Sequence, residues 1–449
     1  MKNAKQYLIK SGKIVNEGKC IQADIFVKNG RIEKIGSDIS VDENHQLIDA
    51  NGKLVFPGAI DDQVHFREPG LTHKADIFTE SRAAVAGGIT SFMEMPNVKP
   101  QTTTQQLLQK KYEIGKQKSL ANFSFYMGTT NENIDEILKT DPLNVCGVKI
   151  FMGSSTGNML VDDEKILNRV FNECPLLIST HCEDENTIKK QLEVYRSKYG
   201  EDIPFEAHPL IRNEEACYLS SSFAISLARK NNTRLHILHI STGKETDLFS
   251  NNLPLRDKKI TSEACIHHLW FSDEDYKEKG SLIKWNPAVK TKEDRSAVWK
   301  ALLDDRIDVI ATDHAPHTFE EKNNKYLQAP SGGPLVQHAL PAMLEFYHQG
   351  KITLEKIVEK MSHAPAICFQ VKDRGFIREG YFADLALIDL ENPWTVSKDN
   401  ILYKCGWSPF EGTTFKSKIT DVFVSGHLAY SENHFDESFM GERLQFDRN

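Results

Sequence analysis

The middle of the chain alternates short apolar stretches with longer stretches of helical character. ADIFTESRAAVAG and NEEACYLSSSFAISLARK place apolar residues at roughly helical spacing. Repeated strand-then-helix units predict an α/β protein with a parallel sheet, and eight units over roughly 300 residues fit a (β/α)8 TIM-like barrel. An open doubly wound sheet is the alternative, but no GxGxxG motif follows an early strand. The predicted strands lie near 59–65, 89–95, 123–128, 147–151, 176–181, 234–240, 258–264 and 307–312.

The two ends of the chain have a different pattern. Residues 7–56 contain short β-favouring stretches broken by Gly, Asn and Ser–Gly turn signals. The tail repeats this style in ADLALIDL (383–390) and DVFVSGHLAY (421–430). We therefore expect a small β-sandwich domain built from both termini, residues 1–56 plus 378–449, beside a barrel of residues 57–377.

Composition and charge narrow the class of protein. The 449 residues are 40% hydrophobic and 26% charged, which is typical of a globular chain and not of a disordered or coiled-coil one. The net charge of −8 means that the chain has no excess positive charge to attract nucleic acid or an anionic membrane. No apolar run reaches the roughly 18 to 20 residues that cross a bilayer, and the start, MKNAKQYLIKSGK, is too polar for a signal peptide. The eight cysteines include no CxxC pair, so we expect reduced thiols in a cytoplasmic protein.

Five polar residues lie at the ends of five different predicted strands. In a barrel, the carboxyl ends of the strands meet at one mouth, where active sites are built. Each residue alone is more often structural, but five at five strand ends indicate a shared site. Three imidazoles, a carboxylate and a lysine are suited to zinc or a similar divalent ion. The five residues are His65, Lys149, His181, His239 and Asp313.

Seven motifs in order resemble dihydroorotases of the amidohydrolase superfamily, over nearly the whole chain. The resemblance implies a metal-dependent barrel enzyme of pyrimidine biosynthesis that interconverts N-carbamoyl-L-aspartate and L-dihydroorotate. It implies that a metal-activated hydroxide attacks the ring carbonyl while an aspartate carries the proton. The motifs are PGAIDDQVHFREPG (57–70), MEMPNVKP (93–100), GVKIFMGSSTG (147–157), THCEDE (180–185), LHILHIST (235–242), WNPAVK (285–290) and ATDHAPH (311–317).

The resemblance also assigns roles to the residues at the strand ends. His65 matches the second histidine of the family's HxH pair, and Lys149 matches a lysine that carries a carbamate bridging two metal ions. His181 and His239 match the ligands of the second ion. Asp313 matches the aspartate that touches the metal and shuttles the proton. One or two zinc ions per chain are therefore expected.

Substrate-binding positions follow from the same motifs. Arg67 can hold the unreacting α-carboxylate of the substrate with a bidentate fork. Asn97, Asn286 and His317 match other substrate-binding positions, and Gly332 lies where family members contact the ring through backbone. The pair His267 and His268 also resembles a family pair, and a structural role is equally open for it. His236 lies three residues before His239, on the opposite face of the predicted strand, and is interpreted as structural.

One position departs from the family pattern. Where the family has HxH, this chain has Gln63-Val64-His65. An amide oxygen is a weaker ligand for zinc than imidazole, so we expect one tightly held ion and a second that is weak or absent. Asp62 is a poor substitute because strand alternation turns its side chain away from the face of Gln63 and His65.

Two other functions are compatible with the sequence. A hydantoinase or allantoinase would share the fold and the metal ligands. A non-catalytic homologue serving as a scaffold for aspartate transcarbamoylase would explain the missing histidine. The family is commonly dimeric, so a homodimer is expected.

Overall fold

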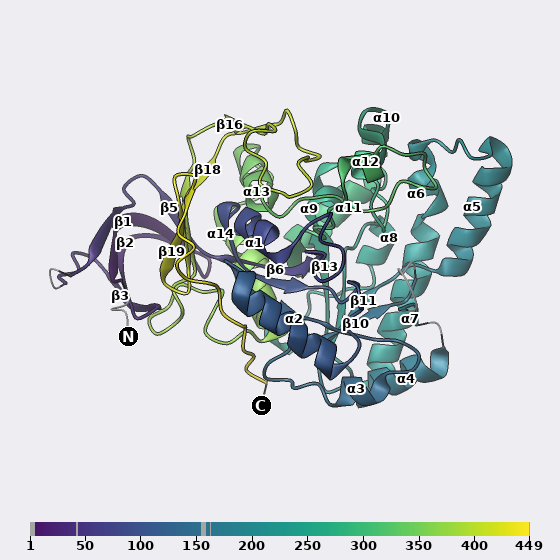
Figure 1. The fold of residues 1–449 in the computed structure, drawn as a ribbon, viewed down its shortest axis with the longest axis horizontal. Coiled ribbons are helices and arrows are strands. Elements are labelled where there is room, and N and C mark those ends of the chain that lie inside the picture. Colours follow the sequence, from purple (N-terminus) through teal and green to yellow (C-terminus); the bar gives the residue numbers. More distant parts are fainter. Residues whose placement is uncertain (1–4, 42–43, 154–158, 162, 449) are drawn as a thin grey trace.

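A computed structural model describes residues 5–41, 44–153, 159–161 and 163–448, and it shows a barrel beside a sheet made from both ends of the chain (Figure 1). The sheet has nine strands, with the N-terminal strands (purple) and the C-terminal strands (yellow) side by side. Its order is β20-β19-β18-β15-β5-β1-β2-β3, with β4 paired to β1. The strands are β1 (Tyr7–Asn16), β2 (Lys19–Lys28), β3 (Arg31–Gly36), β4 (Gln46–Asp49), β5 (Leu54–Pro57), β15 (Leu385–Asp389), β18 (Lys418–Val424), β19 (His427–Ser431) and β20 (His434–Phe435).

The barrel is built from parallel strands in chain order. Strands β6 to β8 form one hydrogen-bonded set and β9 to β14 another, with every pairing parallel. A bridge between Val64 and His314 joins the last strand to the first, and the His65 amide donates to the His314 carbonyl at 2.7 Å. The strands are β6 (Ala59–Val64), β7 (Ile89–Glu94), β8 (Asn122–Phe125), β9 (Met127–Gly128), β10 (Val148–Phe151), β11 (Ile178–His181), β12 (Leu235–Ile237), β13 (Ile260–Cys265) and β14 (Val309–Ala311).

Helices surround the barrel, and side-chain caps mark where several of them begin. Asp76, Thr104 and Asn213 each accept a hydrogen bond from a backbone N–H in the first turn of the helix that follows. The helices are α1 (Ile77–Ala86), α2 (Gln105–Lys118), α3 (Ile134–Leu138), α4 (Glu164–Glu173), α5 (Glu185–Tyr199), α6 (His208–Ile211), α7 (Glu214–Asn231), α8 (Gly243–Thr246), α9 (Ile266–Trp270), α10 (Tyr276–Lys279), α11 (Lys292–Leu303), α12 (Phe319–Lys322), α13 (Ala339–His348), α14 (Leu354–Val358) and α15 (Ala364–Phe369). A two-stranded ribbon joins β16 (Trp394–Thr395) to β17 (Thr414–Phe415).

The predicted fold class is confirmed, since each of the eight predicted strand regions contains barrel strands and the terminal segments form the separate sheet. The boundaries of the two domains stay a prediction. No helix among the described residues is both long and apolar enough to cross a bilayer.

An apolar cluster, here called the plug, packs near the amino ends of the barrel strands. Phe369 of α15 and the tail residues Leu444 and Phe446 pack with Tyr126 and Leu177 from the barrel.

A buried ion pair ties the barrel to the terminal sheet. Arg374 contacts the Asp384 carboxylate at 2.5 Å, and both side chains are about 3% exposed. Asp384 also accepts hydrogen bonds from the Ser425 amide, just after β18, and from Asn122 of β8.

We predict that Arg374→Leu lowers the free energy of unfolding by about 3–5 kcal/mol, because it leaves the Asp384 carboxylate buried without its cation. Arg378→Leu is the matched control, since Arg378 pairs with Glu17 at the surface and should cost about 0–1 kcal/mol. Denaturant unfolding of both variants measures the difference. Equal small losses in the two would contradict the anchoring role of the buried pair.

Candidate active site

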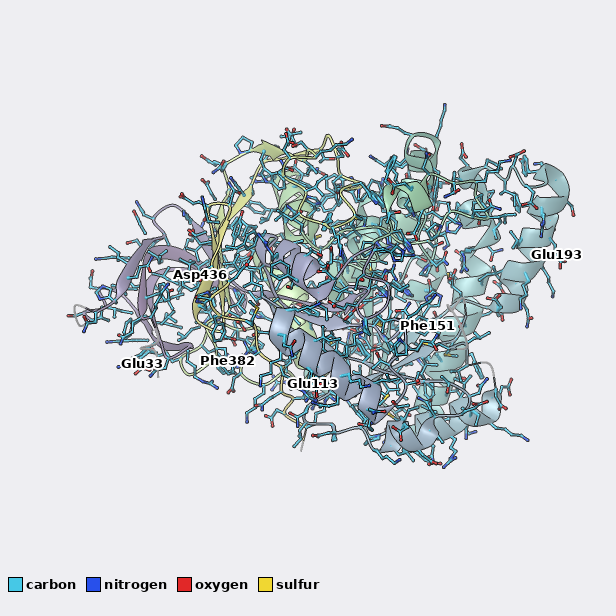
Figure 2. All side chains as sticks on the ribbon, in the orientation of Figure 1. Glu33, Glu113, Phe151, Glu193, Phe382 and Asp436 are labelled. Atoms are coloured by element: carbon cyan, nitrogen blue, oxygen red, sulfur yellow. The ribbon has the colours of Figure 1, made fainter. Side chains whose placement is uncertain are left out.

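A cavity of about 260 Å³ opens at the carboxyl ends of the barrel strands. Phe151, labelled in Figure 2, ends β10 and lines it. All ten residues predicted for the site line this one cavity: His65, Arg67, Asn97, Lys149, His181, His239, Asn286, Asp313, His317 and Gly332. The structure therefore brings together every predicted member, although their roles stay predictions. The last part of the GVKIFMGSSTG motif, 154–157, lies outside the described residues.

Two histidines present converging ring nitrogens. His181 ends β11 and His239 follows β12, and Nδ1 of the first lies 2.9 Å from Nε2 of the second. Burial lowers the pKa of both rings, so both are neutral. Nε2 of His181 lies 3.0 Å from the buried carboxylate of Glu183, the kind of partner that orients a metal-binding histidine. These residues fit a divalent ion held by two neutral imidazoles.

Lys149 lies beside this pair, fully enclosed in the barrel. Burial lowers the pKa of its ammonium group to about 7, although the carboxylates of Glu263 and Asp313 act in the opposite direction. A substantial fraction of the side chain is then a neutral amine at neutral pH. A neutral amine is the form that reacts with carbon dioxide, so the environment of Lys149 fits a carbamate.

Asp313 meets Gln63 and His65 at a single oxygen. Gln63 donates from Nε2 to Oδ1 of Asp313 at 3.1 Å, and Nε2 of His65 lies 3.2 Å from the same oxygen. Burial raises the pKa of Asp313 to about 7. The Gln63 carbonyl oxygen is turned the other way, toward the Cys265 thiol at 3.6 Å. Gln63 therefore presents its amide nitrogen to the cavity, and an amide nitrogen carrying two hydrogens is no metal ligand.

The backbone is strained at three of the cavity residues. Arg67, His239 and Asp313 have φ of 69°, 41° and 49°, a region that non-glycine residues seldom adopt. A neighbouring carboxylate holds the turn at Asp313. The carboxylate of Asp61 binds both the amide and the hydroxyl of Thr312, immediately before Asp313. Strain of this kind is concentrated at functional sites, so its position here favours a functional role for the three side chains.

One wall of the cavity carries a buried guanidinium. Arg67 donates from Nε to the Pro316 carbonyl at 3.0 Å, and its Nη2 lies 3.1 Å from Nε2 of His317. Lys74 donates to Nδ1 of His317, so the His317 hydrogen is on Nε2 and faces the Ser331 carbonyl at 3.0 Å. Among the described residues none accepts a hydrogen bond from Nη1 of Arg67, which leaves N–H groups for an anionic ligand.

Gly332 and Asn286 both line the cavity, but they differ in the polar groups that remain available to a ligand. The Gly332 amide donates to the Lys284 carbonyl and its own carbonyl accepts from Lys322, so both backbone groups already have partners. A side chain at Gly332 would meet the Ala315 carbonyl at 2.5 Å, which explains the glycine. Asn286 has a buried amide oxygen without a hydrogen-bond partner among the described residues, so it is available to a ligand.

His267 and His268 are buried outside the cavity lining. His267 stacks on Trp285 with ring centroids 4.4 Å apart, and His268 faces the Pro287 carbonyl at 3.1 Å. Sequence reasoning missed three supporting contacts: the hydrogen bond from Gln63 to Asp313, the carboxylate of Glu183 beside His181, and the hydrogen bonds from Thr312 to Asp61. The nearest signals were the position of Glu183 inside THCEDE and of Asp61 at the start of DDQVH.

Comparisons with known proteins identify the family of the chain. Residues 54–429 match the amidohydrolase family. A dihydroorotase of Methanosarcina acetivorans is 33% identical over 90% of this chain and 88% of its own length. A dihydroorotase of Pyrococcus abyssi is 31% identical over 97% and 98%.

Two solved structures have a similar fold. An L-hydantoinase (dihydropyrimidinase) from Arthrobacter aurescens superposes with a TM-score of 0.90 at 26% identity, covering 96% of this chain and 97% of its own. A dihydropyrimidinase from Brevibacillus agri gives 0.88 at 22%, covering 99% and 100%, and shows the fold alone.

The barrel and its cavity of histidines, lysine and aspartate define the class of protein as a metal-dependent hydrolase. The chain belongs to the amidohydrolase family, and its curated relatives place it within the dihydroorotase group of that family. The resemblance found in the seven motifs is thereby confirmed.

Proposed function

We propose that this chain catalyses the reversible cyclisation of N-carbamoyl-L-aspartate to L-dihydroorotate. The observation that carries the proposal is the buried Arg67 guanidinium in the wall of the cavity that also holds Lys149 and Asp313. The substrate keeps one carboxylate that does not react, and a planar guanidinium can hold it in a fixed orientation. The dihydroorotase relatives support the same assignment.

Zinc is the proposed metal. A carbamate on Lys149 would hold the tightly bound ion together with His181 and His239. His65 and Asp313 would hold the second, weakly bound ion. When bound there, the ion polarises the ring carbonyl and makes water a competent nucleophile at neutral pH. The two converging imidazoles and the neutral form of Lys149 support this assignment.

Asp313 is the proposed proton carrier. In hydrolysis its carboxylate takes a proton from the attacking water and returns it to the leaving ring nitrogen. A carboxyl group whose pKa burial has raised to about 7 can do both near neutral pH. Gln63 holds the carboxylate in place through its hydrogen bond to Oδ1.

The direction of the reaction depends on pH. Ring closure joins the carbamoyl nitrogen to a carboxyl carbon, releases water and consumes one proton, because a substrate dianion becomes a product monoanion. Lower pH therefore favours cyclisation and higher pH favours hydrolysis.

The enzyme is also proposed to work in the cytoplasm as a homodimer. All eight cysteines are unpaired, which supports a reducing compartment. Aspartate transcarbamoylase stays a predicted partner.

We predict that Arg67→Met lowers kcat/KM for dihydroorotate by roughly 30- to 5000-fold, since losing one partner of a buried charge pair costs about 2–5 kcal/mol. Dihydrouracil is the matched control substrate, because it is the same ring without the carboxylate. Its slow turnover should change far less, so the variant should lose most of the wild type's preference. Steady-state kinetics on both substrates measures this.

Two results would count against this assignment. One is wild-type protein that hydrolyses dihydrouracil or hydantoin as fast as dihydroorotate, which would favour the hydantoinase alternative. The other is an Arg67→Met variant that loses activity equally on both substrates, which would remove the carboxylate from the role of Arg67.

We predict that Gln63→His retains about one more equivalent of zinc per chain than the wild type after exhaustive dialysis. An imidazole at this position would complete the weaker ligand set, whereas the wild-type amide nitrogen occupies Asp313 instead. Gln63→Leu is the control of similar size that supplies no ligand and should match the wild type in metal content. Equal zinc content in wild type and Gln63→His would overturn the assignment of a weak metal site at His65 and Asp313.

A further inference from the structure

A second group of potential metal ligands lies deeper in the barrel than the cavity. Asp62 of β6, His236 of β12 and Glu263 of β13, here called the deep cluster, are all completely buried. The His236 ring packs against Phe369 of the apolar plug, with ring centroids 5.4 Å apart. The deep cluster therefore lies between the plug and the cavity, and none of its members lines the cavity.

The separations within the deep cluster are longer than those of charge-assisted hydrogen bonds. Nε2 of His236 lies 3.2 Å from Oδ2 of Asp62 and 3.3 Å from Oε2 of Glu263. A charged N–H···O bond is typically about 2.7–2.9 Å. Two ligands that share one tetrahedral zinc ion at bond lengths of about 2.0–2.2 Å are roughly 3.4 Å apart, close to the distances seen here.

The other nitrogen of His236 fixes where its hydrogen lies. Nδ1 is 2.8 Å from the hydroxyl oxygen of Thr261, and that hydroxyl donates to the Leu235 carbonyl at 3.4 Å. The hydroxyl therefore accepts from His236, so Nδ1 carries a hydrogen. Nε2 of a neutral ring would then present a lone pair to two carboxylates, which is unfavourable unless a metal ion or a proton lies among the three groups.

Of the three side chains, Asp62 has the fewest polar contacts to offset the burial of its charge. Neither of its carboxylate oxygens accepts a well-aligned hydrogen bond among the described residues; Nε2 of His236 lies 3.2 Å from Oδ2, and the side chain is wholly buried. A buried carboxylate without hydrogen bonds is strongly unfavourable unless an ion or a proton neutralises it. Two carboxylates and a neutral imidazole around a divalent ion have no net charge, which suits an enclosed site.

We propose that the deep cluster binds one divalent transition-metal ion, zinc in the first instance, through Asp62, His236 and Glu263. This ion is separate from the metal of the cavity and does not touch substrate. Two carboxylates with one imidazole form a ligand set that zinc accepts.

The bound ion would act through Glu263. The other oxygen of this carboxylate, Oε1, accepts the backbone N–H of His239 at 3.0 Å, at the residue with φ of 41°. An ion that fixes Glu263 thereby fixes the strained turn that places His239 in the cavity. Glu263 is in this sense a positioning residue.

The competing arrangement uses protons in place of an ion. Burial and the neighbouring Asp62 carboxylate raise the pKa of Glu263. Burial alone would lower the pKa of His236, but the two carboxylates outweigh it and raise that pKa. An imidazolium with one protonated carboxyl group would also leave no net charge, so the experiment must separate a metal from protons.

The decisive experiment is anomalous diffraction from crystals of the whole chain, purified with zinc and dialysed, with data on both sides of the zinc edge. We expect an anomalous peak within coordination distance of all three groups, in addition to density in the cavity. A map without a peak among these three side chains overturns the proposal, whether or not the cavity holds zinc.

Metal analysis in solution gives a second readout that uses no turnover. Asp62→Asn keeps the size of the side chain and should retain about one equivalent less zinc than the wild type. Glu245→Gln is the control, because Glu245 is equally buried but is bonded to Ser221 and Thr242 outside both sites. Equal zinc content in all three proteins would show that the deep cluster holds protons only.

Discussion

The structure depends on the burial of ionisable side chains where the barrel strands end. The buried side chains of Lys149, His181, His239 and Asp313 meet in one cavity, where an unpaired charge is unfavourable. Burial therefore shifts each pKa toward the neutral form, to about 7 for both Lys149 and Asp313. A lysine that can lose its proton, a carboxyl group that can hold one and neutral imidazoles are the forms that metal binding and proton transfer require.

The same constraint accounts for the contacts around the cavity. His181 is oriented by Glu183, and Asp313 is held by Gln63 and by the Thr312 turn that Asp61 binds. In the deep cluster, Glu263 connects a second buried group of charges to the backbone of His239. Two of the three strained cavity residues, His239 and Asp313, thus have a polar group behind them that holds the backbone.

Much of the fold and the site was predictable because it follows from periodicity and from strand ends. The eight strand regions and five cavity residues, His65, Lys149, His181, His239 and Asp313, follow from where the apolar runs end. The other five, Arg67, Asn97, Asn286, His317 and Gly332, depended on the resemblance of the motifs to dihydroorotases. The directions of side chains beyond the strands were harder to predict from the sequence. Strand alternation kept Asp62 and His236 out of the cavity, as expected, yet both meet inside the barrel. The register of β6 shifts between Asp61 and Val64, and His239 lies past the end of β12 with a positive φ, so simple alternation does not extend across either segment.

The most direct test of the account is dihydroorotate hydrolysis by the purified protein, with zinc and bicarbonate present, beside an Asp313→Asn variant. The wild type should hydrolyse dihydroorotate, and the variant should lose about 10²- to 10⁴-fold in kcat, the usual contribution of a positioned acid–base group. An inactive wild type that nevertheless binds zinc would contradict the account and favour a non-catalytic scaffold. Wild-type activity in Asp313→Asn would remove the proton carrier from the mechanism.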